Sequence, residues 1–128
     1  NSIYPTRVAD ALLAKAKAGN GPAADFIIKY GLYKRLLGIK NAFSEKEDLV
    51  MLDDLEACNN YQLDLTELKN LELPISIILG SKDKLVDLKA VDSFANVVPS
   101  KIHTIDEVGH FPFFEAPGEL SKLISSLV

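Results

Sequence analysis

Apolar side chains in the first 60 residues recur every three or four positions, which is the spacing of one face of a helix. We expect the first helix to begin at Pro5 and to stop at residues 19–21, which read Gly-Asn-Gly. Pro22 opens a second helix that ends at Gly31, and a short third helix covers residues 33–37. The pattern gives no strand signal before residue 70, so the first half of the chain is predicted to be helical.

A fourth helix has the clearest start signal. Residues 44–47 read Ser-Glu-Lys-Glu, a capping box in which the serine hydroxyl accepts from a first-turn backbone N–H and the second glutamate reaches back to the serine N–H. The helix ends near residues 59–60 and carries four inward-facing candidates: Leu49, Leu52, Leu55 and Cys58. We expect Cys58 to be a buried, unreactive packing residue.

The pattern changes after Pro74. Residues 75–79 read Ile-Ser-Ile-Ile-Leu, a nearly continuous apolar run that predicts a strand buried on both faces, as in a parallel sheet. Helical spacing returns over residues 87–98, a second strand is expected over residues 101–105, and a last helix over residues 117–128. This order is a βαβα unit, in which a right-handed crossover makes the two strands parallel.

Two parallel strands do not form a stable sheet by themselves, because a strand that is apolar on both faces needs neighbours. We therefore predict an α/β fold whose sheet is incomplete in this chain, with a helical lid over residues 1–65 and a βαβα part of a larger core over residues 66–128. The boundary falls near residues 62–73. The chain opens at Asn1 without an initiator methionine, which fits processing, an edge set by the experiment, or the middle of a longer protein.

Composition narrows the class of protein. The 128 residues are 48% hydrophobic and 25% charged, as in globular proteins, and the net charge is −4. Basic residues are too sparse for a nucleic-acid surface, and no apolar run reaches the ~20 residues of a membrane helix. The single cysteine cannot form an internal disulfide, which favours a cytoplasmic location.

Two residues with useful chemistry follow the two predicted strands. Asp83 comes just after the first strand and His110 lies in the loop after the second, where Gly109 lets the backbone turn tightly. Loops after adjacent parallel strands open on the same edge of the sheet, where ligands bind. A carboxylate beside an imidazole orients it and stabilises its protonated form, so the imidazole can act as a general base. A turn aspartate and a loop histidine bonded to backbone are the plainer alternatives.

The residues around this pair resemble a known family. Gly80-Ser81-Lys82-Asp83 after a strand, then Gly109-His110-Phe111-Pro112 and Glu115-Ala116-Pro117 before a closing helix, are similar to the C-terminal section of the α/β-hydrolase superfamily, in its esterase-like branch. The resemblance covers residues 54–128 well and residues 1–53 loosely, as a helical lid. It implies that Asp83 is the acid and His110 the base of a catalytic triad, and that Glu115 anchors the loop by hydrogen bonds.

One departure from the family pattern is large. The chain contains no G-x-S-x-G, the elbow that carries the serine nucleophile, and no earlier strands or oxyanion-hole loop. We therefore expect this chain to be only the lid and the C-terminal portion of such a hydrolase, with the nucleophile missing from it. Ser81 is the only serine near Asp83, and a turn role fits it better than a nucleophilic one. A metal site of His103, Asp106 and His110 has no ligand spacing to support it.

These features favour one function and leave a second open. The first is a portion of a Ser-His-Asp hydrolase for a small hydrophobic ester or related acyl substrate, with Phe111, Phe26 and Tyr30 as candidate substrate-binding residues and no metal or organic cofactor implied. Phe113 and Phe114 either line an acyl pocket or pack on the last helix. The alternative is a non-catalytic, truncated hydrolase that acts as a self-associating or binding module. In both cases we expect a homo-oligomer or pairing with the missing N-terminal portion.

Overall fold

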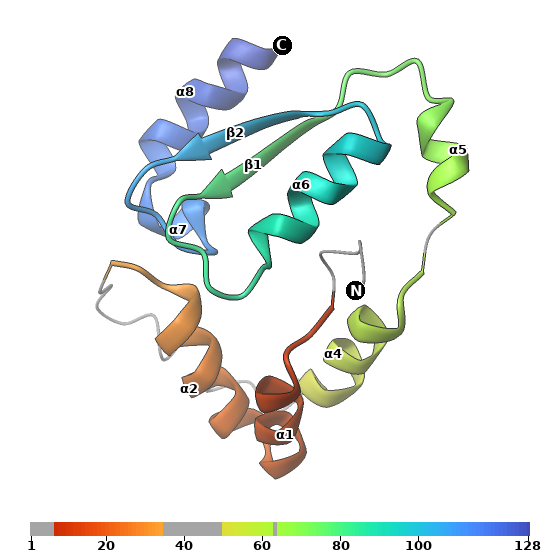
Figure 1. The fold of residues 1–128 in the computed structure, drawn as a ribbon. Coiled ribbons are helices and arrows are strands. Elements are labelled where there is room, and N and C mark those ends of the chain that lie inside the picture. Colours follow the sequence, from red (N-terminus) through yellow and green to blue (C-terminus); the bar gives the residue numbers. More distant parts are fainter. Residues whose placement is uncertain (1–6, 35–49, 63) are drawn as a thin grey trace.

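The computed structural model describes residues 7–34, 50–62 and 64–128, which form seven helices and two strands (Figure 1). The elements in chain order are α1 (Asp10–Ala18), α2 (Asn20–Gly31), α4 (Met51–Asn60), α5 (Leu65–Lys69), β1 (Ser76–Gly80), α6 (Leu88–Val97), β2 (Lys101–Ile105), α7 (Pro112–Glu115) and α8 (Pro117–Leu127). Within these ranges, no helix is both long and apolar enough to cross a membrane.

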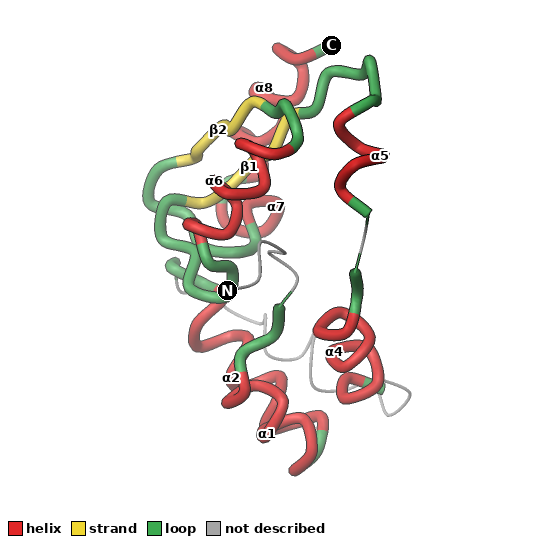
Figure 2. The backbone as a smooth tube through the Cα atoms, turned by 45° about the vertical axis from the view of Figure 1, so that its right-hand side comes forward, coloured by secondary structure: helices red, strands yellow, loops and turns green. Residues whose placement is uncertain are grey.

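Helices α1, α2 and α4 pack together as one group, separate from the strands (Figure 2). Their shared core consists of Val8, Leu12, Ala16 and Ala23, with larger apolar side chains around it. Gly19, at a φ of 132°, separates α1 from α2 in a conformation that other residues avoid, which confirms the predicted stop. The second helix begins at Asn20, two residues before the predicted Pro22.

Parts of the helical prediction fall outside the described residues. These are Pro5 itself, residues 35–37 of the short third helix, and the capping box at residues 44–47 together with Leu49. The first helix begins at Asp10, after residues 7–9 that are not helical, so the predicted start at Pro5 is wrong. Residues 33–34 form a bend and not the predicted helix, and α4 begins at Met51 after a non-helical Val50, later than the predicted start. The described end of the fourth helix, at Asn60 in α4, matches the expected end.

The prediction for Cys58 is wrong, because its thiol lies in the exposed last part of α4. The buried face of α4 is formed by Met51, Leu52 and Leu55, which pack against the helical core. Asn59, four residues after Leu55, continues that face and accepts a hydrogen bond from the Val8 N–H at 3.1 Å. Cys58 therefore points away from the core even though its spacing from Leu55 is helical.

The two strands pair in parallel, as predicted, with Ser76 opposite Lys101 and Gly80 opposite Ile105. Helix α8 packs on one face of the pair, where Ile78, Leu120 and Leu123 surround a buried cluster of Ile105, Val108 and Ala116. Figure 1 shows α6 on the other side of the strands. The strand and helix boundaries agree with the predicted ones to within a residue.

Strand β1 is less buried than its sequence predicts. Ile77, Ile78 and Leu79 are only partly covered, and among the described residues β1 pairs with β2 alone. A strand with this composition is suited to neighbours on both edges. The sheet in this chain is therefore incomplete, as expected from the sequence.

Two short helices were not predicted. Asp64 caps α5 by accepting from the Thr66 N–H at 2.8 Å, and Pro112 occupies the first turn of α7. Both are too short to show a helical repeat of apolar residues, so the sequence pattern gave no signal for them. Helix α7 matters for the site, because it places Glu115 behind the loop that carries His110.

Candidate active site

Asp83 lies in the turn that follows β1, and hydrogen bonds tie this turn to the end of β2 and the loop after it. The Ser81 N–H donates to Ile105 O at 2.9 Å and the Lys82 N–H donates to Val108 O at 2.8 Å. Gly80 permits this approach, since a Cβ at its position would collide with the backbone of Val108. The two strand-end loops are therefore in direct backbone contact, and their side chains meet at the same edge.

The carboxylate of Asp83 is fully engaged. Its side chain is only 4% exposed, and its Oδ2 lies 2.9 Å from His110 Nδ1. Its Oδ1 accepts from the Leu85 N–H at 2.8 Å and the Val86 N–H at 3.1 Å. Burial by itself raises the pKa of Asp83, but the hydrogen bonds from His110, Leu85 and Val86 outweigh it, so the pKa lies below its ordinary value. Asp83 is therefore an ionised acceptor at neutral pH.

The ring of His110 is oriented by this contact. Because ionised Asp83 can only accept, Nδ1 carries the proton and Nε2 is the basic nitrogen. The side chain is 35% exposed, and Phe111 packs edge-on against the ring at a centroid distance of 4.9 Å. An oriented imidazole with one nitrogen on a carboxylate is an arrangement that suits general-base catalysis.

The backbone around His110 is tied to the end of α2. The His110 N–H donates to Gly31 O at 2.6 Å, and the Gly109 N–H donates to Glu115 Oε2 at 2.9 Å. A Cβ on Gly109 would come within 2.8 Å of Tyr33 N and 2.9 Å of Glu115 Oε2. Gly109 is thus needed for close packing, whereas the φ angle does not require glycine there.

Glu115 is the residue whose importance the sequence revealed least. It is a buried carboxylate, 7% exposed, and its Oε1 accepts from the N–H groups of Tyr33 at 2.8 Å and Lys34 at 2.7 Å. The anchoring role expected for it therefore holds for the His110 loop and extends to a segment about 80 residues earlier in the chain. Only its place in the Glu-Ala-Pro motif pointed to it, and no sequence pattern pointed to its partners.

The three candidate substrate-binding residues are placed differently. Phe111 lies beside His110 and packs closely against Gly31, whereas Phe26 packs against the helical core. The ring of Tyr30 packs against that of Phe26 in a tilted arrangement, at a centroid distance of 4.5 Å. Phe111 is therefore the candidate that lies within the Asp83–His110 site, and substrate binding by all three stays a prediction.

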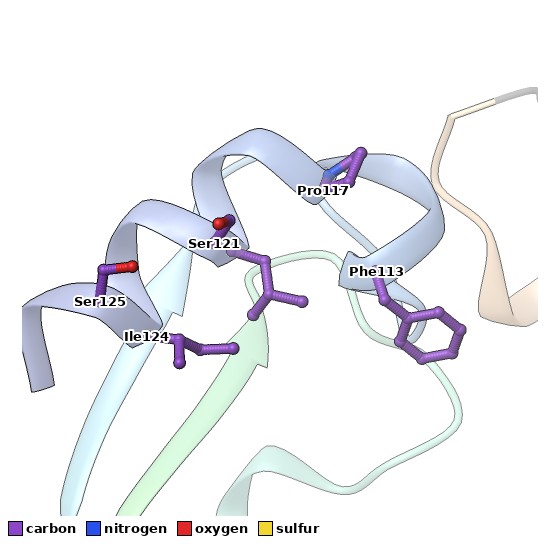
Figure 3. A pocket seen from close by; sticks show the side chains of 6 residues that line it. Phe113, Pro117, Ser121, Ile124 and Ser125 are labelled. Atoms are coloured by element: carbon purple, nitrogen blue, oxygen red, sulfur yellow. The ribbon is translucent and has the colours of Figure 1, made fainter. Parts of the chain in front are cut away.

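Phe113 and Phe114 are 54% and 41% exposed, respectively, on α7. Phe113 borders a shallow hollow of about 270 Å³ between α7 and α8 (Figure 3). The hollow is lined by Phe113, Pro117, Leu120, Ser121, Ile124 and Ser125. Neither Asp83 nor His110 contributes to it, so it is separate from the candidate site.

The hydroxyl of Ser81 is occupied in a turn. It donates to Asp106 Oδ1 at 2.8 Å and accepts from the Glu107 N–H at 2.9 Å, where Glu107 has a left-handed φ of 54°. The hydrogen bond from Ser81, followed by that from Glu107, lowers the pKa of Asp106. These are the contacts of a turn serine.

Across residues 7–34, 50–62 and 64–128, no group of three His, Cys, Asp or Glu side chains could hold a metal ion.

Comparison with known proteins finds one curated relative and several solved structures that are similar to this chain. No family model matches the chain. Over 97 residues it is 32% identical to the epoxide hydrolase EphH of Mycobacterium tuberculosis, a stretch that covers 66% of this chain and 45% of that protein. The chain therefore spans about half the length of the curated relative that it matches.

Solved structures show the same fold. A thermophilic esterase superposes with a TM-score of 0.81 at 22% identity, over 97% of this chain and 52% of that one. An esterase from Exiguobacterium antarcticum gives 0.74 at 16% identity, over 92% and 46%. The α/β hydrolase MGS-M2, from a deep-sea metagenome library, gives 0.65 at 18% identity, over 96% and 52%. With its parallel strands, flanking helices and partial sheet, the chain carries part of the α/β-hydrolase fold.

Proposed function

We propose that this chain supplies the general base and its orienting carboxylate to a hydrolase of carboxylic esters or related acyl compounds. The observation that carries the proposal is the 2.9 Å hydrogen bond between Asp83 Oδ2 and His110 Nδ1, at the carboxyl ends of two parallel strands. The chain has no G-x-S-x-G, so the serine nucleophile is proposed to lie in a part of the protein outside these 128 residues.

The proposed reaction uses His110 twice. Nε2 takes the proton as the serine hydroxyl attacks the ester carbonyl, and the resulting imidazolium is stabilised by ionised Asp83. The imidazolium then protonates the alcohol oxygen as the ester C–O bond breaks, which leaves an acyl-serine. Water attacks this acyl group while His110 again takes a proton, and the imidazolium returns that proton to the serine oxygen as the acyl–serine C–O bond breaks and the acid leaves. The scheme requires no cofactor.

The names of similar proteins support the class and suggest a second substrate. Two of the three solved structures named above are esterases, while the relative at 32% identity is an epoxide hydrolase. Esters and epoxides both present an electrophilic carbon to a nucleophile, and both need a base to complete turnover. An epoxide is therefore the second candidate substrate, and the helices of residues 1–65 are proposed to form the lid over it.

The test is hydrolysis of p-nitrophenyl butyrate and of styrene oxide by the protein that contains this chain together with the nucleophile. We expect His110→Ala to lower kcat by about 10³-fold or more, because it removes the general base. His103→Ala is the matched control, since His103 lies in β2 and is not bonded to Asp83. Turnover that is unaffected by His110→Ala would contradict the proposal, and the preferred substrate would decide between ester and epoxide.

A further inference from the structure

The carboxylate of Glu115 is surrounded by backbone N–H groups from two distant parts of the chain. Oε1 accepts from Tyr33 and Lys34 at 2.8 and 2.7 Å, and Oε2 accepts from Gly109 at 2.9 Å. A buried carboxylate is costly unless it is hydrogen-bonded, and bonds to an ionised acceptor are stronger than neutral ones. Three such bonds satisfy this group and make it a strong junction between the two segments.

A second contact connects the same two segments. The His110 N–H donates to Gly31 O at 2.6 Å, and Gly31 is two residues before Tyr33, the first of the two residues whose N–H groups donate to Glu115 Oε1. A Cβ on Gly31 would lie 2.6 Å from Phe111 Cε2 and 2.9 Å from Leu85 Cδ1. The end of α2 therefore lies against the loop that follows β2 (Figure 1). The two segments meet where each carries a glycine, Gly31 in one and Gly109 in the other.

We infer that Glu115 is a positioning residue for His110, and that it makes the orientation of the His110 ring depend on the position of the α2 end. One oxygen fixes Gly109, the residue directly before His110, and the other fixes Tyr33 and Lys34, two and three residues after Gly31. If the segment of residues 31–34 shifts, Glu115 and the Gly31 carbonyl lose their partners together, and the loop that aims His110 at Asp83 is released. The inference rests on the proposed function in one respect, that His110 acts as the base.

Glu115 acts through the backbone and has no contact with the reacting nitrogen. The imidazole already has its carboxylate partner in Asp83. Glu115 accepts a hydrogen bond from the Gly109 backbone N–H and makes none with the His110 ring. Its loss should therefore loosen the Asp83–His110 hydrogen bond without removing either partner. This effect differs from that of a change at Asp83, which removes the bond itself.

The test uses the full chain with Glu115→Ala and Glu115→Gln, and follows two signals by NMR. The first is the low-field resonance of the His110 Nδ1 proton, and the second is amide exchange at Tyr33, Lys34 and Gly109. Glu115→Ala should accelerate exchange at these three amides by about tenfold or more and weaken the Nδ1 resonance. Glu115→Gln should give a smaller change, because its amide keeps one acceptor oxygen but turns an N–H donor toward a backbone N–H.

Glu119→Ala and Glu119→Gln are the matched controls, because Glu119 is an exposed glutamate on α8. They should leave both signals unchanged. Amides of β1 and β2 report global unfolding. If they also exchange faster in Glu115→Ala, that variant is destabilised as a whole, and the inference is then tested with Glu115→Gln. An unchanged Nδ1 resonance in a folded Glu115 variant whose amides exchange faster would overturn the inference. Unchanged exchange in the folded Gln variant would also overturn it.

Failure of the proposed function would give a different result. In that case His110→Ala would leave hydrolysis unchanged, while the Glu115 variants would still alter the Nδ1 resonance. If the function and the inference both hold, Glu115→Ala lowers kcat in proportion to the loss of the Nδ1 resonance, and the Glu119 variants do not.

Discussion

The helical region and the strand region of this chain bury different kinds of side chains. The core of α1, α2 and α4 is built from small and medium apolar residues such as Val8, Leu12 and Ala23. The strand region has an apolar core as well, but it also encloses the carboxylates of Asp83 and Glu115. Each of these accepts backbone hydrogen bonds that offset the cost of burial.

This difference separates a packing role from a chemical one. Apolar burial stabilises a region without restricting which atoms face a substrate, whereas hydrogen-bonded carboxylates fix the direction of their partners. The strand region is therefore the place where a reaction can be organised. The helical region influences it through the contacts of Glu115 and Gly31.

The substitution with the largest expected effect is Asp83→Asn in the strand region, and the quantity affected is kcat. The side chain keeps its size, but it loses the charge that holds the His110 tautomer and stabilises the imidazolium, so we expect kcat to fall by about 10⁴-fold. Steady-state kinetics with p-nitrophenyl butyrate measures it, in the protein that also contains the nucleophile. Asp92→Asn, on the exposed surface of α6, is the control. A loss of less than tenfold would show that the strand region does not organise the reaction.

A core substitution in the helical region should act on stability instead. Leu12→Ala removes a side chain that is 6% exposed, and we expect a loss of about 3 kcal/mol in the free energy of unfolding. Urea denaturation measures this loss, and Leu127→Ala, at a side chain that is 41% exposed, should cost less than about 1 kcal/mol. If Leu12→Ala changed the Asp83–His110 hydrogen bond in the folded protein, the two regions would be coupled more broadly than through Glu115 and Gly31.

The smallest expected effect is a dependence of stability on pH. The folded pKa of Asp83 is lower than its ordinary value, so ionised Asp83 stabilises the fold above the unfolded pKa of about 4. This contribution is lost as the pH falls through the lowered folded pKa. Asp83→Asn should therefore flatten the acid side of the stability curve, measured by urea denaturation between about pH 3 and pH 6. An identical slope in Asp92→Asn and Asp83→Asn would contradict this prediction.

The fold of the strand region was largely predictable from the sequence. The apolar run at residues 75–79, the helical spacing at residues 87–98 and the Pro117 start each matched an element to within a residue. The parallel pairing followed from the crossover, and comparison with solved structures confirmed the partial α/β-hydrolase fold. These features are local or follow from chain connectivity, so spacing and turn residues are sufficient to predict them.

Burial was harder to predict than element type. Cys58 shares helical spacing with Leu55 but lies outside the core, because the contacts of α4 continue through Asn59 instead. Strand β1 is apolar on both faces, yet its faces are only partly covered in this chain. In both cases the deciding factor is which neighbour is present, and residue spacing carries no information about that.

By itself, the sequence determined the order of the elements and the positions of Asp83 and His110 after the two strands. Tertiary structure alone decided that Glu115 joins Gly109 to Tyr33 and Lys34, across separations of 6, 82 and 81 residues. The physical reason is that a buried carboxylate takes whichever backbone N–H groups the fold brings to it. Every residue other than proline carries such a donor, so the letters of the sequence do not distinguish the ones that are used.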